Sequence, residues 1–221
     1  MASARAKDIL SPRLSLLMSA ILLAALLIQA ARTEAGGPSD PCASPTLTGT
    51  STQDFAAGCI DEDGGSVKTE SPATQSNPHW TKVTVPPGFP GGVTIEEHEE
   101  FPPEVDEVGA AGLAVDCDPS RGRYTCLISD IFTTQTTTRK KPMIFRFTVD
   151  KSTFPRGTRI GRIRIFHDEK RVPRCDDEDS VKIGYQLEQG QQSCHAKTVR
   201  LRNRDVRFVV LTTINGRWRF K

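Results

Sequence analysis

The sequence predicts an exported, all-β protein that is stapled by disulfides. Three observations support this fold class: an apolar run near the N-terminus, six cysteines that all follow this run, and a series of short β-type runs after residue 79 that end in proline or glycine. An even number of cysteines after a signal peptide is typical of a disulfide framework in an oxidising compartment. We therefore expect a secreted or cell-surface protein, built as a β-sandwich with a C-terminal β appendage.

Residues 1–35 are predicted to form a signal peptide. Residues 14–31 are an apolar run without a charge, and three basic residues precede it. Thr33 and Ala35 have the spacing that a signal peptidase prefers, so we expect cleavage after Ala35. An uncleaved signal anchor is the alternative, because the run is at the short edge of what spans a bilayer. Membrane attachment is expected only in that case.

Residues 36–78 are predicted to form a flexible leader. They are rich in Gly, Ser, Thr, Pro and Asp and contain few large apolar residues. Such a segment buries too little surface to offset the entropy of ordering its chain. Cys42 and Cys59 are expected to close one loop within it.

Residues 79–172 are predicted to form the β-sandwich. Runs with alternating, β-branched or aromatic residues occur at 80–85, 93–96, 113–117, 123–128, 143–149 and 159–166. Turn residues separate them at roughly the spacing of a sandwich. The turn-like segment 118–122 predicts a hairpin whose two strands carry Cys117 and Cys126.

Residues 173–221 are predicted to form a separate C-terminal β-hairpin region, with one enlarged sandwich as the alternative. Its expected strands are 181–187, 198–201, 206–214 and 217–220. Asn215-Gly216 is a strong signal for a type I′ turn, which would pair the last two strands as a hairpin.

The six cysteines allow fifteen connectivities. We expect the sequential pairs, because each closes a short loop within one local segment. These pairs are Cys42 with Cys59, Cys117 with Cys126, and Cys175 with Cys194. A zinc site is not favoured, because the chain has neither CxxC-type spacings nor clustered histidines.

Four segments between residues 83 and 166 together form one pattern. They are a strand with a proline-glycine corner, a hairpin with two cysteines, a strand rich in Phe, Thr and Val, and a late strand that contains glycine. They read VTVPPGF, VDCDPSRGRYTC, FRFTV and GTRIGRIRI. In this pattern the chain resembles the Ig-like conserved-repeat domains of bacterial surface and secreted proteins. The resemblance implies an Ig-like sandwich and an extracellular binding or structural role.

No catalytic constellation is evident, so a non-enzymatic protein without a cofactor is expected. The chain lacks a G-x-S-x-G elbow, an S-x-x-K pair and a glycine-rich phosphate loop. His98 stands in an acidic run at residues 96–100. Carboxylates together with an imidazole can bind a metal ion, but we favour a solvated acidic loop. His79, His167 and His195 are isolated in sequence. A secreted hydrolase or enzyme accessory protein is the alternative function.

The distribution of charge gives the most specific functional hypothesis. Acidic residues dominate 54–118, whereas basic residues dominate 139–221. Residues two apart on a strand share a face, which groups Arg162 with Arg164 and gives the candidate polyanion-binding set Arg200, Arg202, Arg217 and Arg219. An anionic glycan or cell-envelope polymer is the expected partner; a protein partner is open and nucleic acid is not favoured. The wet face of an ordinary sheet is the alternative interpretation.

Overall fold

The computed structural model describes residue 42 and residues 54–70, 73–99, 117–175 and 186–221. The predicted signal peptide, the expected arm 113–116 and most of the expected strand 181–187 lie outside the described residues. Within the described residues there is no α-helix, and hence none that is long and apolar enough to cross a membrane.

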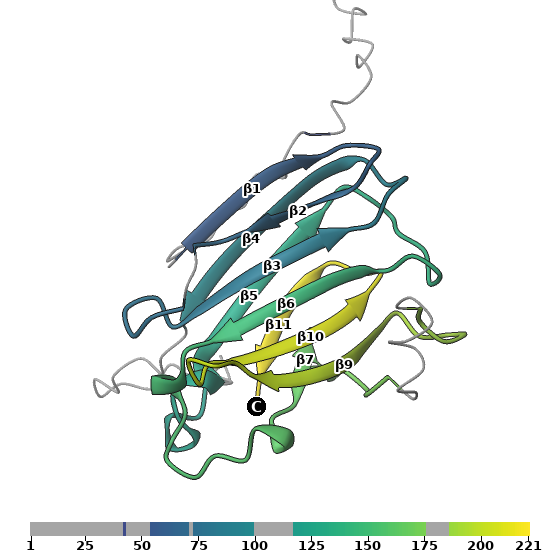
Figure 1. Cartoon of the computed structure of the whole chain (residues 1–221). Helices are drawn as coiled ribbons and strands as arrows, with labels where there is room; N and C mark the ends of the chain where they lie inside the picture. Colours follow the sequence, from purple (N-terminus) through teal and green to yellow (C-terminus); the bar gives the residue numbers. More distant parts are fainter. Residues whose placement is uncertain (1–41, 43–53, 71–72, 100–116, 176–185) are drawn as a thin grey trace, which may run out of the picture. The chain divides into compact units, whose positions relative to one another are not determined.

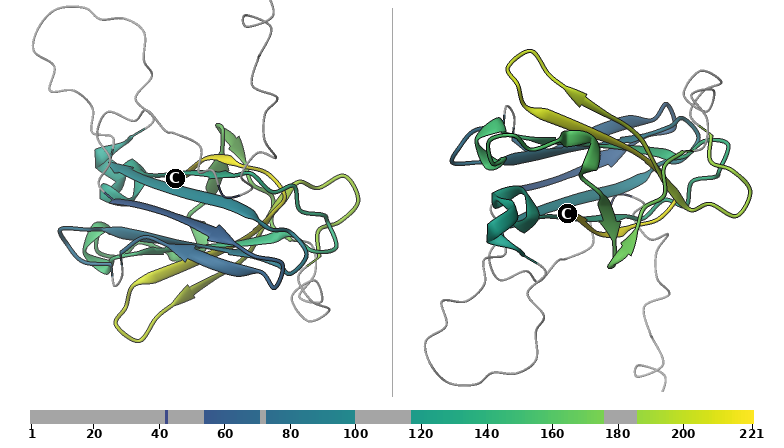
Figure 2. Two further views of the ribbon diagram at one scale, coloured as in Figure 1. Left: turned by 90° about the horizontal axis from the view of Figure 1, so that it is seen from above. Right: turned by 90° about the horizontal axis from the view of Figure 1, so that it is seen from below.

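Two antiparallel sheets form the two layers of one compact unit (Figures 1 and 2). The six-stranded sheet has the order β1 (Asp54–Ile60), β4 (Gly91–Glu99), β5 (Leu127–Thr133), β11 (Gly216–Phe220), β7 (Ile165–His167) and β8 (Lys170–Arg171). The five-stranded sheet has the order β2 (Gly65–Lys68), β3 (His79–Val85), β6 (Met143–Val149), β10 (Val206–Thr212) and β9 (Ser193–Arg200). In the described part of the chain, four 3-10 turns lie between strands: η1 (Pro119–Arg121), η2 (Arg123–Cys126), η3 (Lys151–Thr153) and η4 (Ile160–Arg162).

Aromatic side chains from both sheets meet in one core. Phe145 and Phe147 of β6 are fully buried, as are Trp218 and Phe220 of β11. The Trp218 ring centroid lies 5.4 Å from that of Phe145, and the Phe220 centroid lies 5.4 Å from that of Phe147, both pairs edge to face. This geometry is favourable for aromatic pairs, and it joins the two sheets as a β-sandwich.

The C-terminal strands are integral to both sheets, which corrects the prediction of an appendage starting at residue 173. β10 lies between β6 and β9, and β11 lies between β5 and β7. The runs that form these strands are as apolar on their inner faces as the rest of the core. They bury that surface only by completing the two sheets.

Asn215-Gly216 does not form the predicted hairpin turn, because β10 and β11 belong to different sheets. Asn215 instead closes the end of β5: its Nδ2 donates to the Thr133 carbonyl at 2.8 Å, and its Oδ1 accepts from Thr133 Oγ1 at 2.6 Å. Gly216 has φ 128°, and a Cβ there would lie 2.6 Å from His167 Nε2. Asn215 and Gly216 therefore lie where the chain crosses from the five-stranded sheet to the six-stranded sheet.

Part of the predicted flexible leader is structured. Residues 54–68 provide β1 and β2, and β1 pairs with β4 along its whole length. Ile60 and Val67 are buried in the core. A Cβ on Gly58 would lie 2.7 Å from Val67 Cγ2, so the small residues of β1 allow close packing. Small residues made this strand hard to distinguish from a linker by composition.

All six cysteines are disulfide-bonded, in the pairs Cys42–Cys59, Cys117–Cys126 and Cys175–Cys194. These are the three sequential pairs.

Candidate anion-binding groove

The loop between β6 and β7, residues 150–164, is fixed to the sandwich at several points. The Phe154 ring packs on Tyr124, with centroids 4.9 Å apart, and Ile163 is buried. Arg164 and Lys221 exchange two backbone hydrogen bonds of 2.6 and 2.9 Å. At the start of the loop, Asp150 Oδ1 accepts from the Ser152 amide at 2.7 Å and caps η3. The loop backbone is thus held in place although many of its side chains are exposed.

A tight turn forms the outermost part of this loop. The Thr158 amide donates to the Pro155 carbonyl at 3.1 Å, and Gly157, third in the turn, has φ 84°. Glycine is typical of the third position of such a turn, where φ is positive, and Pro155 stands at the first position. Arg156 lies between them and is exposed.

Two hollows flank this turn, and both are lined by basic side chains. The first, of about 600 Å³, has the basic lining Arg121, Arg156, Arg159, Arg162, Arg164 and Lys221. The second, of about 290 Å³, has the basic lining Lys151, Arg156, Arg200 and Arg204. Because residues 155–158 line both, we treat the two hollows as one feature, the basic groove.

The β9–β10 turn contributes the far wall of the groove. Arg204 has φ 75°, a conformation uncommon for a residue with a side chain. It is held there by hydrogen bonds that close the turn, from the Arg204 amide to the Leu201 carbonyl and from the Leu201 amide to the Asp205 carbonyl. Buried Asp205 also accepts from the Lys151 amide at 3.2 Å, which joins the turn to the β6–β7 loop.

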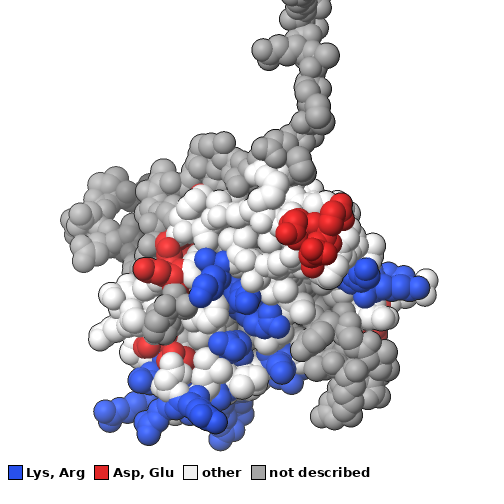
Figure 3. Space-filling model, turned by 45° about the horizontal axis from the view of Figure 1, so that its top comes forward, with Lys and Arg blue, Asp and Glu red and all other residues white. Residues whose placement is uncertain are grey.

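The groove has almost no internal counter-charge. No aspartate or glutamate lines either hollow. Arg121 pairs with Asp118 at 2.9 Å, but among the described residues no carboxylate lies within ion-pair distance of Arg156, Arg159 or Arg162. Lys and Arg gather at the end of the unit that carries this loop (Figure 3). A cluster of cations with few carboxylates near it creates a field that attracts anions.

The positive field also affects His195, which lies on β9. Its pKa is lowered to about 4, chiefly by burial and further by the charges of Arg174 and Arg164. His195 is therefore neutral at physiological pH and does not add to the charge of the groove.

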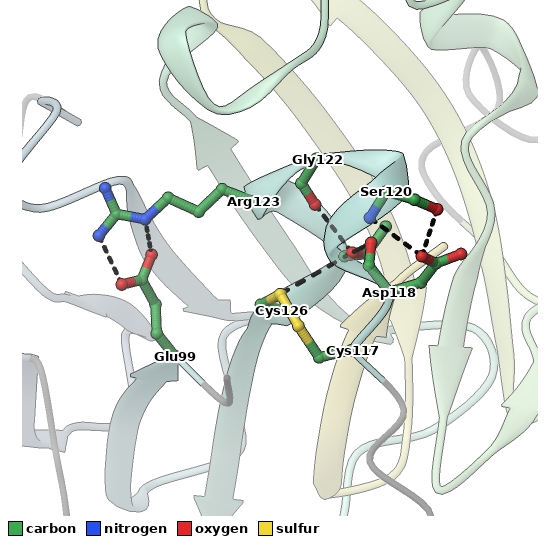
Figure 4. The surroundings of a disulfide bond; sticks show 8 residues. Glu99, Cys117, Asp118, Ser120, Gly122, Arg123 and Cys126 are labelled. Atoms are coloured by element: carbon green, nitrogen blue, oxygen red, sulfur yellow. Dashed lines mark hydrogen bonds and ion pairs between the residues drawn. A yellow bond between two sulfur atoms is a disulfide. The ribbon is translucent and has the colours of Figure 1, made fainter. Parts of the chain in front are cut away.

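The Cys117–Cys126 disulfide supports the wall formed by η1 and η2 (Figure 4). Thr125 Oγ1 donates to the carbonyls of Asp118 and Gly122, both at 2.8 Å. Residues 123–126 are thus a 3-10 turn and not the predicted strand. Side-chain hydrogen bonds and the disulfide replace cross-strand pairing there. Residues 160–162, expected in a strand, likewise form η4.

The structure places the four predicted arginines in different surroundings. Arg200 lines the groove, whereas Arg202 is exposed at the β9–β10 turn and lines neither hollow. Arg217 and Arg219 lie on β11, in the other sheet. Arg217 makes two hydrogen bonds of 2.8 Å to the carboxylate of Asp130. The predicted single patch of Arg200, Arg202, Arg217 and Arg219 is therefore wrong, because it depended on a hairpin that does not form.

Most groove residues were missed because they lie in loops, where no alternation groups them. Arg162 and Arg164 do line the same hollow, although from η4 and the segment after it and not from one strand. A usable signal was present in composition: residues 151–164 contain Lys151, Arg156, Arg159, Arg162 and Arg164 without any acidic residue.

The acidic run is not the solvated loop that was predicted, because its described part lies in β4 and Glu96, Glu97 and His98 are buried. His98 Nε2 lies 3.5 Å from both Glu96 Oε2 and Asp130 Oδ2. No group of three or more metal-ligating side chains is found among the described residues. Residues 100–116, which include the rest of the acidic run, lie outside the described part.

Glu97 and His79 form a sealed polar pair inside the sandwich. Neither side chain is exposed, and Glu97 Oε1 lies 3.9 Å from His79 Nε2. Burial raises the pKa of Glu97 to about 8 and lowers the pKa of His79 to about 4. Acid–base chemistry on a substrate requires contact with that substrate, which this pair cannot make in the closed sandwich.

Comparison of the chain with protein-family models, curated proteins and solved structures finds no match.

Proposed function

We propose that the protein is a secreted or surface-exposed, non-enzymatic β-sandwich module of Ig-like type that binds an anionic glycan or cell-envelope polymer in the basic groove. The observation that carries this proposal is the lining of the groove: two adjoining hollows with many basic side chains and no aspartate or glutamate. Three disulfides support an oxidising, extracytoplasmic location.

The groove suits a polymer better than a single small anion. Its two hollows adjoin along the turn at residues 155–158, so cations are spread along a path and not focused on one point. Its arginines present planar, multi-donor groups that pair well with sulfate, phosphate and carboxylate. A chain of such groups would engage both hollows at once, which raises its affinity over that of one unit.

Binding of heparin, a sulfated glycan, tests the proposal. We expect binding at low salt whose logarithmic affinity falls steadily with the logarithm of salt concentration, because bound cations release counterions from the polymer. The double variant Arg156→Gln/Arg159→Gln should bind heparin about tenfold more weakly, since it removes two charge-assisted contacts.

The matched control is Arg139→Gln/Lys140→Gln, which removes the same charge from an exposed turn outside the groove. It should leave heparin binding nearly unchanged. Equal losses in the two double variants would show that net charge, and not the groove, governs binding. Absence of binding at low salt would refute the proposed function.

A further inference from the structure

A second basic surface lies on the outer face of the five-stranded sheet. The strands of this sheet contain no aspartate or glutamate, and their basic residues are Lys68, Lys82, Arg146, Lys197, Arg200 and Arg207. The six-stranded sheet, in contrast, carries acidic residues in β1, β4 and β5. A band of Lys and Arg crosses the face seen in Figure 3.

The strand register aligns three of these cations in one row. Lys82 lies opposite Arg146, Arg146 opposite Val209, and Val209 opposite Lys197. The row crosses four strands and therefore spans roughly 14 Å. Among the described residues, no carboxylate lies within ion-pair distance of these three side chains. Like charges directly opposite each other destabilise a sheet, so a ligand that neutralises them would be favoured.

Protection of a sheet edge does not explain the row. A lysine on an edge strand discourages pairing with another chain, and this accounts for Lys197 on β9. Arg146 lies on β6, the central strand of the five. At this central position Arg146 cannot protect a sheet edge.

A hollow of about 180 Å³ lies on this face toward β9. Its cations are Arg146, Lys197 and Arg207, and its apolar lining is Val199, Leu201 and Val209. Both guanidinium groups are held in place. Arg146 Nη1 donates to Thr84 Oγ1 at 3.1 Å, Arg207 Nε donates to Thr148 Oγ1 at 3.2 Å, and the Arg207 guanidinium lies 5.6 Å from the Trp80 ring centroid. Cations ordered in advance lose less entropy on binding.

The combination of cations and an apolar floor selects among anions. Polyphosphate offers charge alone, whereas an acidic sugar offers a C–H face together with sulfate or carboxylate groups. A few placed polar groups over an apolar lining are typical of a small-molecule subsite. We propose that this hollow binds one acidic sugar unit of a sulfated or uronic polysaccharide, whose chain crosses the strands along Lys82, Arg146 and Lys197. The proposal names a site separate from the groove and holds whether or not the groove binds.

A heparin-derived tetrasaccharide and tripolyphosphate are the probes, followed by NMR of methyl groups. The tetrasaccharide should shift the methyl signals of Val199, Leu201 and Val209, and tripolyphosphate should not. Arg146→Gln/Lys197→Gln should weaken the tetrasaccharide contact at these methyls about tenfold, because two charged contacts are lost. Val199→Thr keeps the shape and charge of the hollow but adds a hydroxyl to its floor, so it should weaken the tetrasaccharide alone.

Two controls separate this site from the groove. Arg139→Gln/Lys140→Gln should leave the methyl shifts unchanged. Arg156→Gln/Arg159→Gln should also leave them unchanged, even if it abolishes binding of long heparin. Unshifted methyls, equal shifts with tripolyphosphate, or full binding by Arg146→Gln/Lys197→Gln would each overturn the proposal.

Discussion

Glu97 is a carboxylic acid that stays protonated inside the sandwich at neutral pH. Burial raises its pKa to about 8, although Thr69 Oγ1 donates to its Oε1 at 3.0 Å. His79 beside it stays neutral, because burial lowers its pKa to about 4, and its Nε2 lies 3.2 Å from the Ile128 carbonyl. Two neutral groups avoid the large cost of burying charge.

These buried groups predict a stability maximum near pH 6.5. The folded state keeps the proton of Glu97 that the unfolded chain loses near pH 4.5, so this group makes stability fall as pH rises toward 8. His79 and His195 have the opposite effect, so they make stability fall as pH drops below about 6.5. In the unfolded chain these histidines take up protons below about pH 6.5, whereas in the folded state they do so only near pH 4. Each group contributes at most about 1.4 kcal/mol per pH unit. Denaturant unfolding at several pH values measures the curve.

Glu97→Gln isolates the alkaline limb of this curve. Glutamine keeps the shape and cannot ionise, so stability should become nearly flat between pH 6.5 and 8. The histidine limb on the acidic side should remain. A variant that keeps the alkaline slope, or a His79 found protonated by NMR at pH 7, would show that the pair is ionised.

The Arg217–Asp130 pair predicts a structural role for an arginine that the sequence placed in a binding patch. Arg217→Gln should lower the free energy of unfolding by about 1 kcal/mol, because it breaks a bidentate bond to a carboxylate that is mostly buried. Arg156→Gln, at an exposed position, should change it by less than about 0.5 kcal/mol. Urea unfolding of the two variants compares them, and equal effects would contradict the distinction.

At the scale of elements, the long β-branched runs were predictable and the connections were not. The expected strands 80–85 and 143–149 nearly coincide with β3 and β6, because alternation fixes their buried face. The hairpin predicted at Asn215-Gly216 does not form. The local preference for a turn is outweighed by the burial of Trp218 and Phe220 in the opposite layer. The alternation of residues along strands could not predict the groove, because tertiary contacts bring its loops together.

Two of the disulfides are expected to stabilise the fold to different degrees. Cys117–Cys126 closes a loop of separation 9, and Cys175–Cys194 one of separation 19. Replacing either pair by alanine should cost about 2–4 kcal/mol. The longer loop should cost about 0.6 kcal/mol more, since loop-closure entropy grows slowly with length.

Guanidinium unfolding of both alanine pairs, with unreduced wild-type protein as reference, gives the two costs. Peptide mapping without reduction checks the pairing itself. A cross-link from Cys117 to Cys175 or Cys194 would contradict it.

At the scale of the whole chain, we predict a mature N-terminus at Gly36. The apolar run at residues 14–31 and the small residues that follow it carry this prediction. N-terminal sequencing of protein recovered from the medium or envelope checks it. A full-length chain retained in membranes would contradict cleavage.

Among the described strands, acidic residues occur in one layer only, whereas basic residues occur in both. Basic residues without acidic ones occupy the strands of the five-stranded sheet, while acidic residues lie in β1, β4 and β5 of the other. The sequence showed only an acidic first half and a basic second half. Because the chain alternates between the sheets, that gradient alone could not predict which layer would carry which charge.

The crossing from β10 to β11 makes each layer depend on the other while the protein folds. β11 follows the other described strands in the chain, yet it lies inside its sheet between β5 and β7 and supplies Trp218 and Phe220 to the core. Until β11 docks, β5 and β7 lack their shared neighbour and the aromatic core is open to solvent. Folding therefore has to bring together strands that are far apart in the sequence, a step that is slow and that leaves apolar surface exposed to aggregation in the meantime.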